Sequence, residues 1–210
     1  MSKARFISVE GIEGVGKSTH LGFIHEYLST RGVQVLMTRE PGGTPAAERI
    51  RQLLLDPGAE QLSQEAELLL MFAARALHVE NVIRPALKAG RWVICDRFVD
   101  ASYAYQGGGR GMPTQRIAAL ERWVLKGLKP DLTLLLDAPV AVGLARMTRR
   151  GPRDRFEREQ AAFFSRVRRS YLARAKREPR RIRVVAAGAG LVEVRHQIRA
   201  LLDARLRRWL

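Results

Sequence analysis

Residues 9–19 constrain the fold of this chain more than any other stretch. They read Val-Glu-Gly-Ile-Glu-Gly-Val-Gly-Lys-Ser-Thr and fit the pattern G-x-x-x-x-G-K-[ST] of a phosphate-binding loop. An apolar run at residues 6–9 leads into the loop, and apolar residues at helical spacing follow it. The sequence therefore predicts a strand, a phosphate-binding loop and a helix in that order. A glycine-rich turn with an idle lysine is the alternative, and the agreement of pattern and flanks disfavours it.

The residue types of the loop explain how it binds phosphate. Gly11, Gly14 and Gly16 allow backbone angles that other residues rarely adopt, and they let the backbone approach an anion closely. Backbone N–H groups then surround the anion, and the start of the next helix adds its positive end. We expect Lys17 to reach the β- and γ-phosphates and Ser18 to hold Mg²⁺ through its hydroxyl. The predicted nucleotide-binding residues of the loop are Gly11, Ile12, Glu13, Gly14, Val15, Gly16, Lys17, Ser18 and Thr19.

Length and composition are typical of one soluble α/β domain. A chain of 210 residues can bury its own core, so we expect a single domain over residues 1–210. No apolar run is long enough to span a membrane, and no signal peptide precedes the first strand. Cys95 is the only cysteine, which excludes an intrachain disulfide and a cysteine-based metal cluster. We therefore expect a cytoplasmic protein.

The net charge of +16 raises the hypothesis of nucleic-acid binding. The distribution of charge weakens that hypothesis. Residues 141–185 hold 15 Lys and Arg against 4 Asp and Glu, whereas residues 1–140 hold 17 against 15. The basic character therefore belongs mainly to one stretch. Polyphosphate binding explains part of it, and a solvated basic face remains open for the rest.

Strand and helix patterns alternate along the whole chain. Strands are predicted at residues 4–9, 33–37, 91–95, 132–136 and 183–185. Helices are predicted at residues 17–31, 46–55, 64–87, 117–128, 140–148, 157–176 and in the amphipathic tail up to residue 210. Such alternation favours an α/β fold with a parallel sheet. The three glycines at 107–109 predict an irregular loop rather than a regular element.

Charged residues at predicted strand ends are the first candidates beyond the loop. Asp96 ends an apolar run, where a second carboxylate that organises Mg²⁺ is expected downstream of a phosphate loop. Arg39 follows the second strand, and it either meets an anion in the ligand crevice or lies on the surface.

Polar residues in two other segments are candidates for substrate contact. Arg75 lies inside an apolar helical block, so its charge needs a partner, either the polar edge of a substrate or a carboxylate such as Glu67 or Glu80. Tyr105 and Gln106 suit a sugar ring and the hydrogen-bonding edge of a base. A flexible loop between helices is the alternative for the second segment.

An arginine-rich segment interrupts the regular pattern near residues 148–157. It contains Gly-Pro at 151–152 and four arginines, which are Arg149, Arg150, Arg153 and Arg155. In a phosphoryl-transfer enzyme such a segment is a candidate lid, because arginines there would neutralise charge on the moving group.

The chain resembles the bacterial thymidylate kinases from end to end. The resemblance rests on the phosphate loop and on five further segments, which are R-E-P-G-G-T (39–44), M-F-A-A-R (71–75), D-R-F (96–98), A-Y-Q-G-G-G-R-G (104–111) and R-G-P-R-D-R-F-E (150–157). The resemblance implies a P-loop NTPase fold with a five-stranded parallel sheet flanked by helices on both faces, and a homodimer. It implies a single kinase domain that converts ATP and dTMP to ADP and dTDP with Mg²⁺, on the pathway to dTTP.

The resemblance also implies roles for individual residues. Glu13 matches an acidic residue that touches the 3′-hydroxyl of the acceptor, and Tyr105 matches a tyrosine under the deoxyribose. Arg75 matches the arginine that hydrogen-bonds thymine, and Arg97 matches one that holds the acceptor phosphate. Asp96 matches the carboxylate near Mg²⁺. The remaining implied positions are Arg39 and Arg51 assisting at the phosphate, Ser102 and Gln106 beside the base, and Arg146 near adenine.

Two positions differ from parts of the family. Some members carry a catalytic arginine in the phosphate loop, where this chain has Gly14, so the lid must supply it here. Arg153 is the first candidate, followed by Arg149 or Arg150. Many relatives stack a phenylalanine on thymine four residues before the base-reading arginine. This chain has Met71 there and Phe72 next to it, and the sequence leaves open which of the two covers the thymine ring; Phe72 is included among the candidate substrate contacts.

Two rival functions remain to be distinguished. A kinase of another nucleoside monophosphate would share the phosphate loop, but its acceptor residues would differ. A nucleic-acid-binding P-loop ATPase would explain the positive charge and predicts hydrolysis stimulated by DNA or RNA with steep salt dependence. We expect no nucleic-acid partner and no membrane partner.

Overall fold

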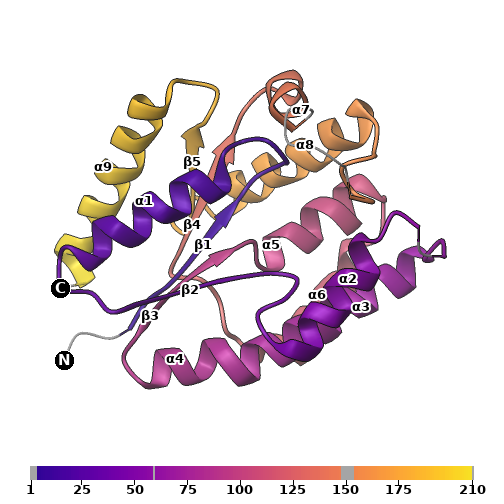
Figure 1. Cartoon of the computed structure of the whole chain (residues 1–210), viewed down its shortest axis with the longest axis horizontal. Coiled ribbons are helices and arrows are strands. Elements are labelled where there is room, and N and C mark those ends of the chain that lie inside the picture. Colours follow the sequence, from indigo (N-terminus) through magenta and orange to yellow (C-terminus); the bar gives the residue numbers. More distant parts are fainter. Residues whose placement is uncertain (1–3, 59, 148–153, 210) are drawn as a thin grey trace.

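Five parallel strands form the centre of the computed structural model, which describes residues 4–58, 60–147 and 154–209. The strand order is β2-β3-β1-β4-β5, and every neighbouring pair is parallel (Figure 1). The strands are β1 (Phe6–Glu10), β2 (Val35–Arg39), β3 (Trp92–Asp96), β4 (Leu132–Asp137) and β5 (Ile182–Ala186). This sheet confirms the predicted α/β fold class.

Helices connect the strands and cover both faces of the sheet. They are α1 (Lys17–Ser29), α2 (Pro45–Leu55), α3 (Gln64–His78), η1 (Val79–Ile83), α4 (Arg84–Lys88), α5 (Val99–Ser102), η2 (Tyr103–Gly109), α6 (Thr114–Leu125), α7 (Val140–Met147), α8 (Ala161–Arg177) and α9 (Leu191–Trp209). Figure 1 shows α1 and α9 on one side of the sheet and α3, α4 and α6 on the other. The predicted helix at 64–87 is divided, because η1 is a π-helical segment between α3 and α4.

Two clusters of buried side chains explain the layers. Ile7 and Val9 pack in a cluster with residues of α1 and α9, whereas Phe6 packs in a second cluster with residues of α3 and α6. Side chains alternate between the two faces of a strand, so the central strand β1 contributes side chains to both clusters. Its apolar residues are fully buried or nearly so, which is typical of a parallel sheet covered on both faces.

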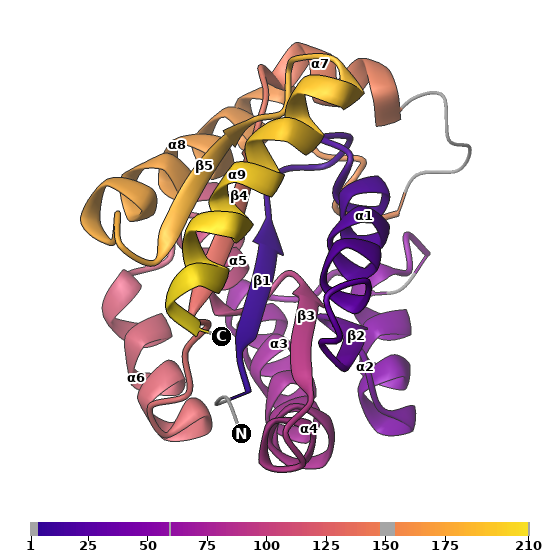
Figure 2. The same cartoon turned by 90° about the vertical axis from the view of Figure 1, so that its left-hand side faces the viewer.

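The topology brings the polar strand ends to one edge. Val9 pairs with Asp96 in the register of β1 and β3, so the loop after β1 begins beside Asp96 and Arg97. In Figure 2 the loop after β1 and helix α7 lie at the same end of the sheet. Ligands of open α/β sheets bind at this carboxyl edge. In the described part of the chain, no helix is long and apolar enough to cross a membrane.

The prediction of an irregular loop at the three glycines is wrong. Residues 103–109 form the π-helix η2, which packs closely on α8. A Cβ atom added at Gly108 would lie 2.5 Å from the Cβ of Ser170, and one added at Gly109 would lie 2.5 Å from the ring of Phe163. These glycines therefore permit close helix contact, and that contact compensates for their low helix propensity.

Replacing Gly109 with alanine is expected to destabilise the fold. The added methyl group would overlap the Phe163 ring, and such overpacking typically costs about 1–3 kcal/mol. Gly22→Ala in α1 is the matched control, because no atom lies within 4 Å of its new Cβ. That control should gain about 0.5–1 kcal/mol from helix propensity. Urea unfolding of both variants measures the difference, and equal stabilities would contradict the close contact.

Candidate active site

The phosphate loop has the positive φ angles that its glycines were expected to allow. Gly11, Gly14 and Gly16 have φ angles of 142°, 72° and 89°. A Cβ atom at Gly14 would lie 2.0 Å from the carbonyl oxygen of Gly143 in α7. An arginine at position 14 would therefore require α7 to move, so this loop has no room for the arginine that some family members carry there.

Lys17 folds back over the loop at the start of α1. Its Nζ donates to the carbonyl oxygens of Gly11 and Ile12 at 3.2 and 2.9 Å. Burial lowers the pKa of Lys17 to about 8, and the nearby positive charge of Arg97 adds to this effect. Lys17 is half-buried, and among the described residues its ammonium has no carboxylate hydrogen bond, so it is suited to an anionic ligand that would stabilise its charge.

Asp96 stands at the end of β3 in the same pocket as Lys17 and Ser18. Its Oδ1 is buried and has no hydrogen-bond partner among the described residues. Buried polar atoms are normally satisfied, so this orphaned oxygen indicates a missing ligand. A carboxylate and a hydroxyl are the oxygen donors that Mg²⁺ prefers, and the two residues fit a magnesium site.

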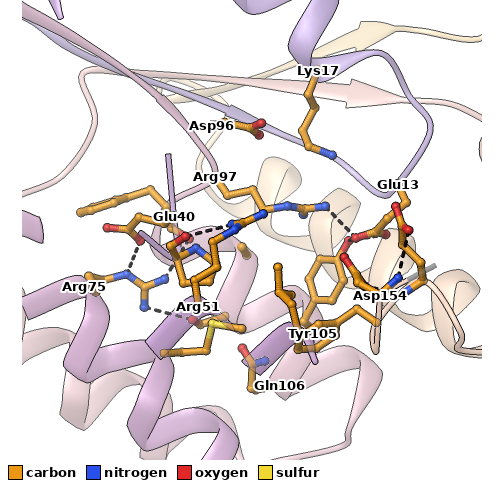
Figure 3. Close-up of a pocket in the computed structure, with 18 of the residues that line it drawn as sticks. Glu13, Lys17, Glu40, Arg51, Arg75, Asp96, Arg97, Tyr105, Gln106 and Asp154 are labelled. Atoms are coloured by element: carbon orange, nitrogen blue, oxygen red, sulfur yellow. Dashed lines mark hydrogen bonds and ion pairs between the residues drawn. The ribbon is translucent and has the colours of Figure 1, made fainter. Parts of the chain in front are cut away.

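Arg97 joins the ends of β1 and β3. It has a left-handed backbone with φ of 66°, and its guanidinium donates to Oε1 of Glu13 at 2.8 Å. The hydroxyl of Tyr105 also donates to Glu13, at 2.6 Å from Oε2, and Arg97 lies over the Tyr105 ring. Figure 3 shows Arg97 between the Lys17 side of the pocket and the Tyr105 side.

Glu10 is a buried glutamate that was not predicted from the sequence, and it is linked to Arg97 through the hydroxyl of Tyr171. Glu10 accepts the backbone N–H of Phe98 at 2.7 Å and the hydroxyl of Tyr171 at 2.7 Å. The same hydroxyl accepts a 3.2 Å hydrogen bond from Arg97. Burial, together with the charge of Asp100, raises the pKa of Glu10 to about 8. The residue directly precedes the phosphate-loop motif, which was its only sequence signal.

Arg75 has three hydrogen-bond partners inside the protein, which use three of the five N–H groups of its guanidinium. Its guanidinium donates to Oε2 of Glu40 at 2.7 Å, to Oγ of Ser102 at 3.0 Å and to the carbonyl oxygen of Phe98 at 3.3 Å. The carboxylate partner is thus Glu40, and neither Glu67 nor Glu80 takes that place. Glu40 stands in the R-E-P segment, so its position in that motif was the available signal.

These side chains surround one cavity of about 240 Å³. The predicted site residues that line it are Glu13, Gly14, Lys17, Ser18, Arg51, Arg75, Asp96, Arg97, Ser102, Tyr105 and Gln106. Lining residues that were not predicted include Glu40, Leu55, Asp154, Phe156 and Glu157. Arg146 lines a separate hollow with Gly14, Val15, Gly16 and Thr19, and Gly14 also lines the cavity.

Two predicted substrate contacts lie outside the cavity. Phe72 is 2% exposed in the second core cluster, and Met71 lines the cavity instead, because successive helical positions point in different directions. Arg39 forms an ion pair with Glu48 and is 54% exposed, which agrees with the surface alternative. The sequence left both positions open, and the structure places Arg39 on the surface and Met71 rather than Phe72 at the cavity.

The candidate lid is only partly visible. Arg149, Arg150 and Arg153 lie outside the described residues. Arg155 is described, and its guanidinium donates to the carbonyl oxygen of Leu54 and to Glu67 at 2.8 and 2.7 Å. Because its guanidinium contacts Leu54 and Glu67 and not the phosphate loop, Arg155 is the weakest of the four candidates for the catalytic arginine.

Comparison with known proteins agrees with this geometry. The model of the family described as thymidylate kinase matches residues 9–198. The thymidylate kinase of Chromohalobacter salexigens is 58% identical over 211 residues and the whole of both chains, and that of Pseudomonas syringae pv. tomato is 58% identical over 96% of each chain. A crystal structure of thymidylate kinase from Ehrlichia chaffeensis has a TM-score of 0.77 and 34% identity, covering 95% of this chain and 98% of that one.

The identity, the coverage and the shared fold all point to the same family. The sequence segments on which the resemblance was based line one cavity beside the phosphate loop. This chain therefore belongs to the thymidylate kinase family.

Proposed function

We propose that this enzyme transfers the γ-phosphoryl group of ATP to dTMP, giving ADP and dTDP for dTTP synthesis. One observation carries the proposal together with the family match. Lys17 and Ser18 of the phosphate loop line the same cavity as Arg75, Tyr105 and Gln106. A donor phosphate and an acceptor nucleotide can therefore meet in one cavity, and in-line transfer requires that the two be held close together.

The donor nucleotide would occupy the loop and the hollow beyond it. Backbone N–H groups and Lys17 hold the phosphates of ATP, and Arg146 lies beside the adenine. This placement is supported by the hollow that Arg146 shares with Val15, Gly16 and Thr19. Arg146 is held there by a 3.3 Å hydrogen bond to the carbonyl oxygen of Ala187.

The acceptor would lie across the other half of the cavity. Arg75, Ser102 and Gln106 contact the base, while Tyr105 lies under the deoxyribose. Glu13 meets the 3′-hydroxyl. Arg97 binds the acceptor phosphate with help from Arg51, which lines the cavity and donates to the carbonyl oxygen of Pro41 at 2.9 Å.

Mg²⁺ is part of the proposal, held by Ser18 and Asp96. When bound, the ion neutralises charge on the phosphates and orients them. The orphaned Oδ1 of Asp96 supports this assignment. Within the chain itself, Lys17 and Arg97 fix the two phosphate groups, and closure of the lid keeps water from attacking in place of the acceptor.

A lid arginine would stabilise the moving phosphoryl group. Arg153 is our first choice, with Arg149 and Arg150 next, and Arg155 is disfavoured by its contacts with Leu54 and Glu67. The crowding of Gly14 by the backbone of Gly143 supports a lid origin for this arginine. The lid spans roughly residues 148–157 of what we propose to be a single kinase domain.

We further propose a cytoplasmic homodimer without a nucleic-acid or membrane partner. A dimer is supported by Trp123 and Leu69, which are 75% and 56% exposed on the neighbouring helices α6 and α3. The cytoplasm supplies both ATP and nucleoside monophosphates. Ion pairs with carboxylates engage several arginines of the basic stretch, including Arg168 and Arg174, which leaves less of its charge for nucleic acid.

An acceptor panel tests the proposed reaction. ADP release is measured with MgATP and dTMP, dUMP, dCMP, UMP, AMP, GMP or no acceptor. We expect strong turnover with dTMP, a weaker signal with dUMP and little with the others. Turnover that favours another nucleotide would contradict the acceptor assignment, and activity that needs added DNA or RNA would favour the ATPase alternative.

The hydroxyl of Tyr171 is expected to affect the KM for dTMP and not the KM for ATP. Tyr171→Phe removes the group that joins Arg97 to Glu10, so Arg97 loses one of its two side-chain hydrogen bonds. We expect KM for dTMP to rise about tenfold or more and KM for ATP to stay within about twofold, since a lost hydrogen bond to a charged group costs roughly 1.5–3 kcal/mol. Tyr103→Phe is the control, because its hydroxyl bonds Glu121 instead. Equal effects on both KM values would count against this role of Tyr171.

A further inference from the structure

Glu67 is a buried carboxylate with three side-chain partners beside the base end of the cavity. It stands in the first turn of α3, and its side chain is 2% exposed. Oε1 accepts from Nε2 of Gln106 at 2.8 Å. Oε2 accepts from Arg110 at 3.2 Å and from Arg155 at 2.7 Å. Neither the family resemblance nor the phosphate-transfer geometry uses this residue.

The contact with Glu67 determines which way the amide of Gln106 points. A carboxylate oxygen accepts hydrogen bonds, so the amide nitrogen of Gln106 must face Glu67 and its carbonyl oxygen must face away. Gln106 lines the cavity, and among the described residues its Oε1 has no hydrogen-bond partner. The cavity therefore receives an acceptor from Gln106 and not a donor.

Arg75 presents hydrogen-bond donors to the same cavity. A guanidinium has donors only, and Glu40 and Ser102 fix its orientation. An arginine donor and a glutamine acceptor match a pyrimidine whose position 4 is a carbonyl and whose N3 carries a hydrogen. Cytosine has the reverse pattern, with an amino group at position 4 and an unprotonated N3.

We propose that Glu67 is a positioning residue that locks the Gln106 amide and thereby makes the cavity select a 4-keto pyrimidine over cytosine. The inference rests on the proposed function, because it assigns the base specificity of that same site. Glu67 acts through Gln106 and does not itself touch the substrate.

The surroundings of Glu67 make it a rigid support. Arg155 is fixed by a hydrogen bond from its Nε to the carbonyl oxygen of Leu54 and by one from its backbone N–H to Leu55. Arg110 is fixed by its ion pair with Glu159 and by its position over the Phe163 ring. The carboxylate is therefore held by two anchored guanidinium groups, and rotation of the Gln106 amide would leave an oxygen facing an oxygen.

Glu67→Gln tests the lock with a nearly isosteric change. A glutamine at position 67 can donate as well as accept, so the Gln106 amide is free to present either end to the cavity. The readout is the ratio of kcat/KM for dTMP to kcat/KM for dCMP. We expect this ratio to fall at least tenfold, with thermal unfolding used to verify the fold. Glu159→Gln removes a carboxylate from the same network without touching Gln106, and its ratio should stay that of the wild type.

Gln106→Met completes the test by removing the amide itself. It should also lower the ratio at least tenfold, and adding Glu67→Gln to it should change the ratio no further, because Glu67 acts through Gln106. A folded Glu67→Gln enzyme with the wild-type ratio would overturn the proposal, as would a Gln106→Met enzyme that keeps it. The proposal would also be overturned if Glu67→Gln lowered the dTMP-to-dCMP ratio as much in the Gln106→Met enzyme as it does in the wild-type enzyme. A preference of the wild-type enzyme for another acceptor would contradict the proposed function. That result comes from the wild-type enzyme alone, so it is distinct from the results with the variants.

Discussion

The ion pair between Arg97 and Glu13 is the contact on which the rest of the site depends. It joins the end of β3 to the phosphate loop after β1, and parallel pairing of the two strands places these ends side by side. Tyr105 bonds the same Glu13 carboxylate, and Tyr171 bonds Arg97 and Glu10. One connected set of hydrogen bonds thus links the donor loop with the acceptor half of the cavity.

The high positive charge of the chain has an internal explanation for part of its arginines. Asp100 is 1% exposed and is bonded by both Arg174 and Arg181, which lowers its pKa although burial acts in the opposite direction. Arg168 likewise holds Asp137 at the end of β4 with two hydrogen bonds. These arginines compensate buried or half-buried carboxylates, so the net charge by itself is poor support for a nucleic-acid partner.

Local patterns in the sequence were sufficient to predict the strands, the phosphate loop and the polar strand ends. Asp96 was predicted because an apolar run ends there, and the sheet brings it to the loop. The carboxylate partner of Arg75 could not be predicted, since Glu40 is 35 positions away and only the fold brings them together. The ordered π-helix at residues 103–109 was missed because its glycines serve contacts with α8, which no local pattern reveals.

The central claim is that the donor phosphates and the acceptor nucleotide meet in one cavity beside the phosphate loop. A compound that joins adenosine and thymidine through a chain of phosphates tests it most directly, by competition binding against each nucleotide separately. We predict that this compound displaces both ATP and dTMP and binds far more tightly than either, because one molecule gains both sets of contacts. Displacement of only one nucleotide, with simultaneous binding of the other, would contradict a shared cavity.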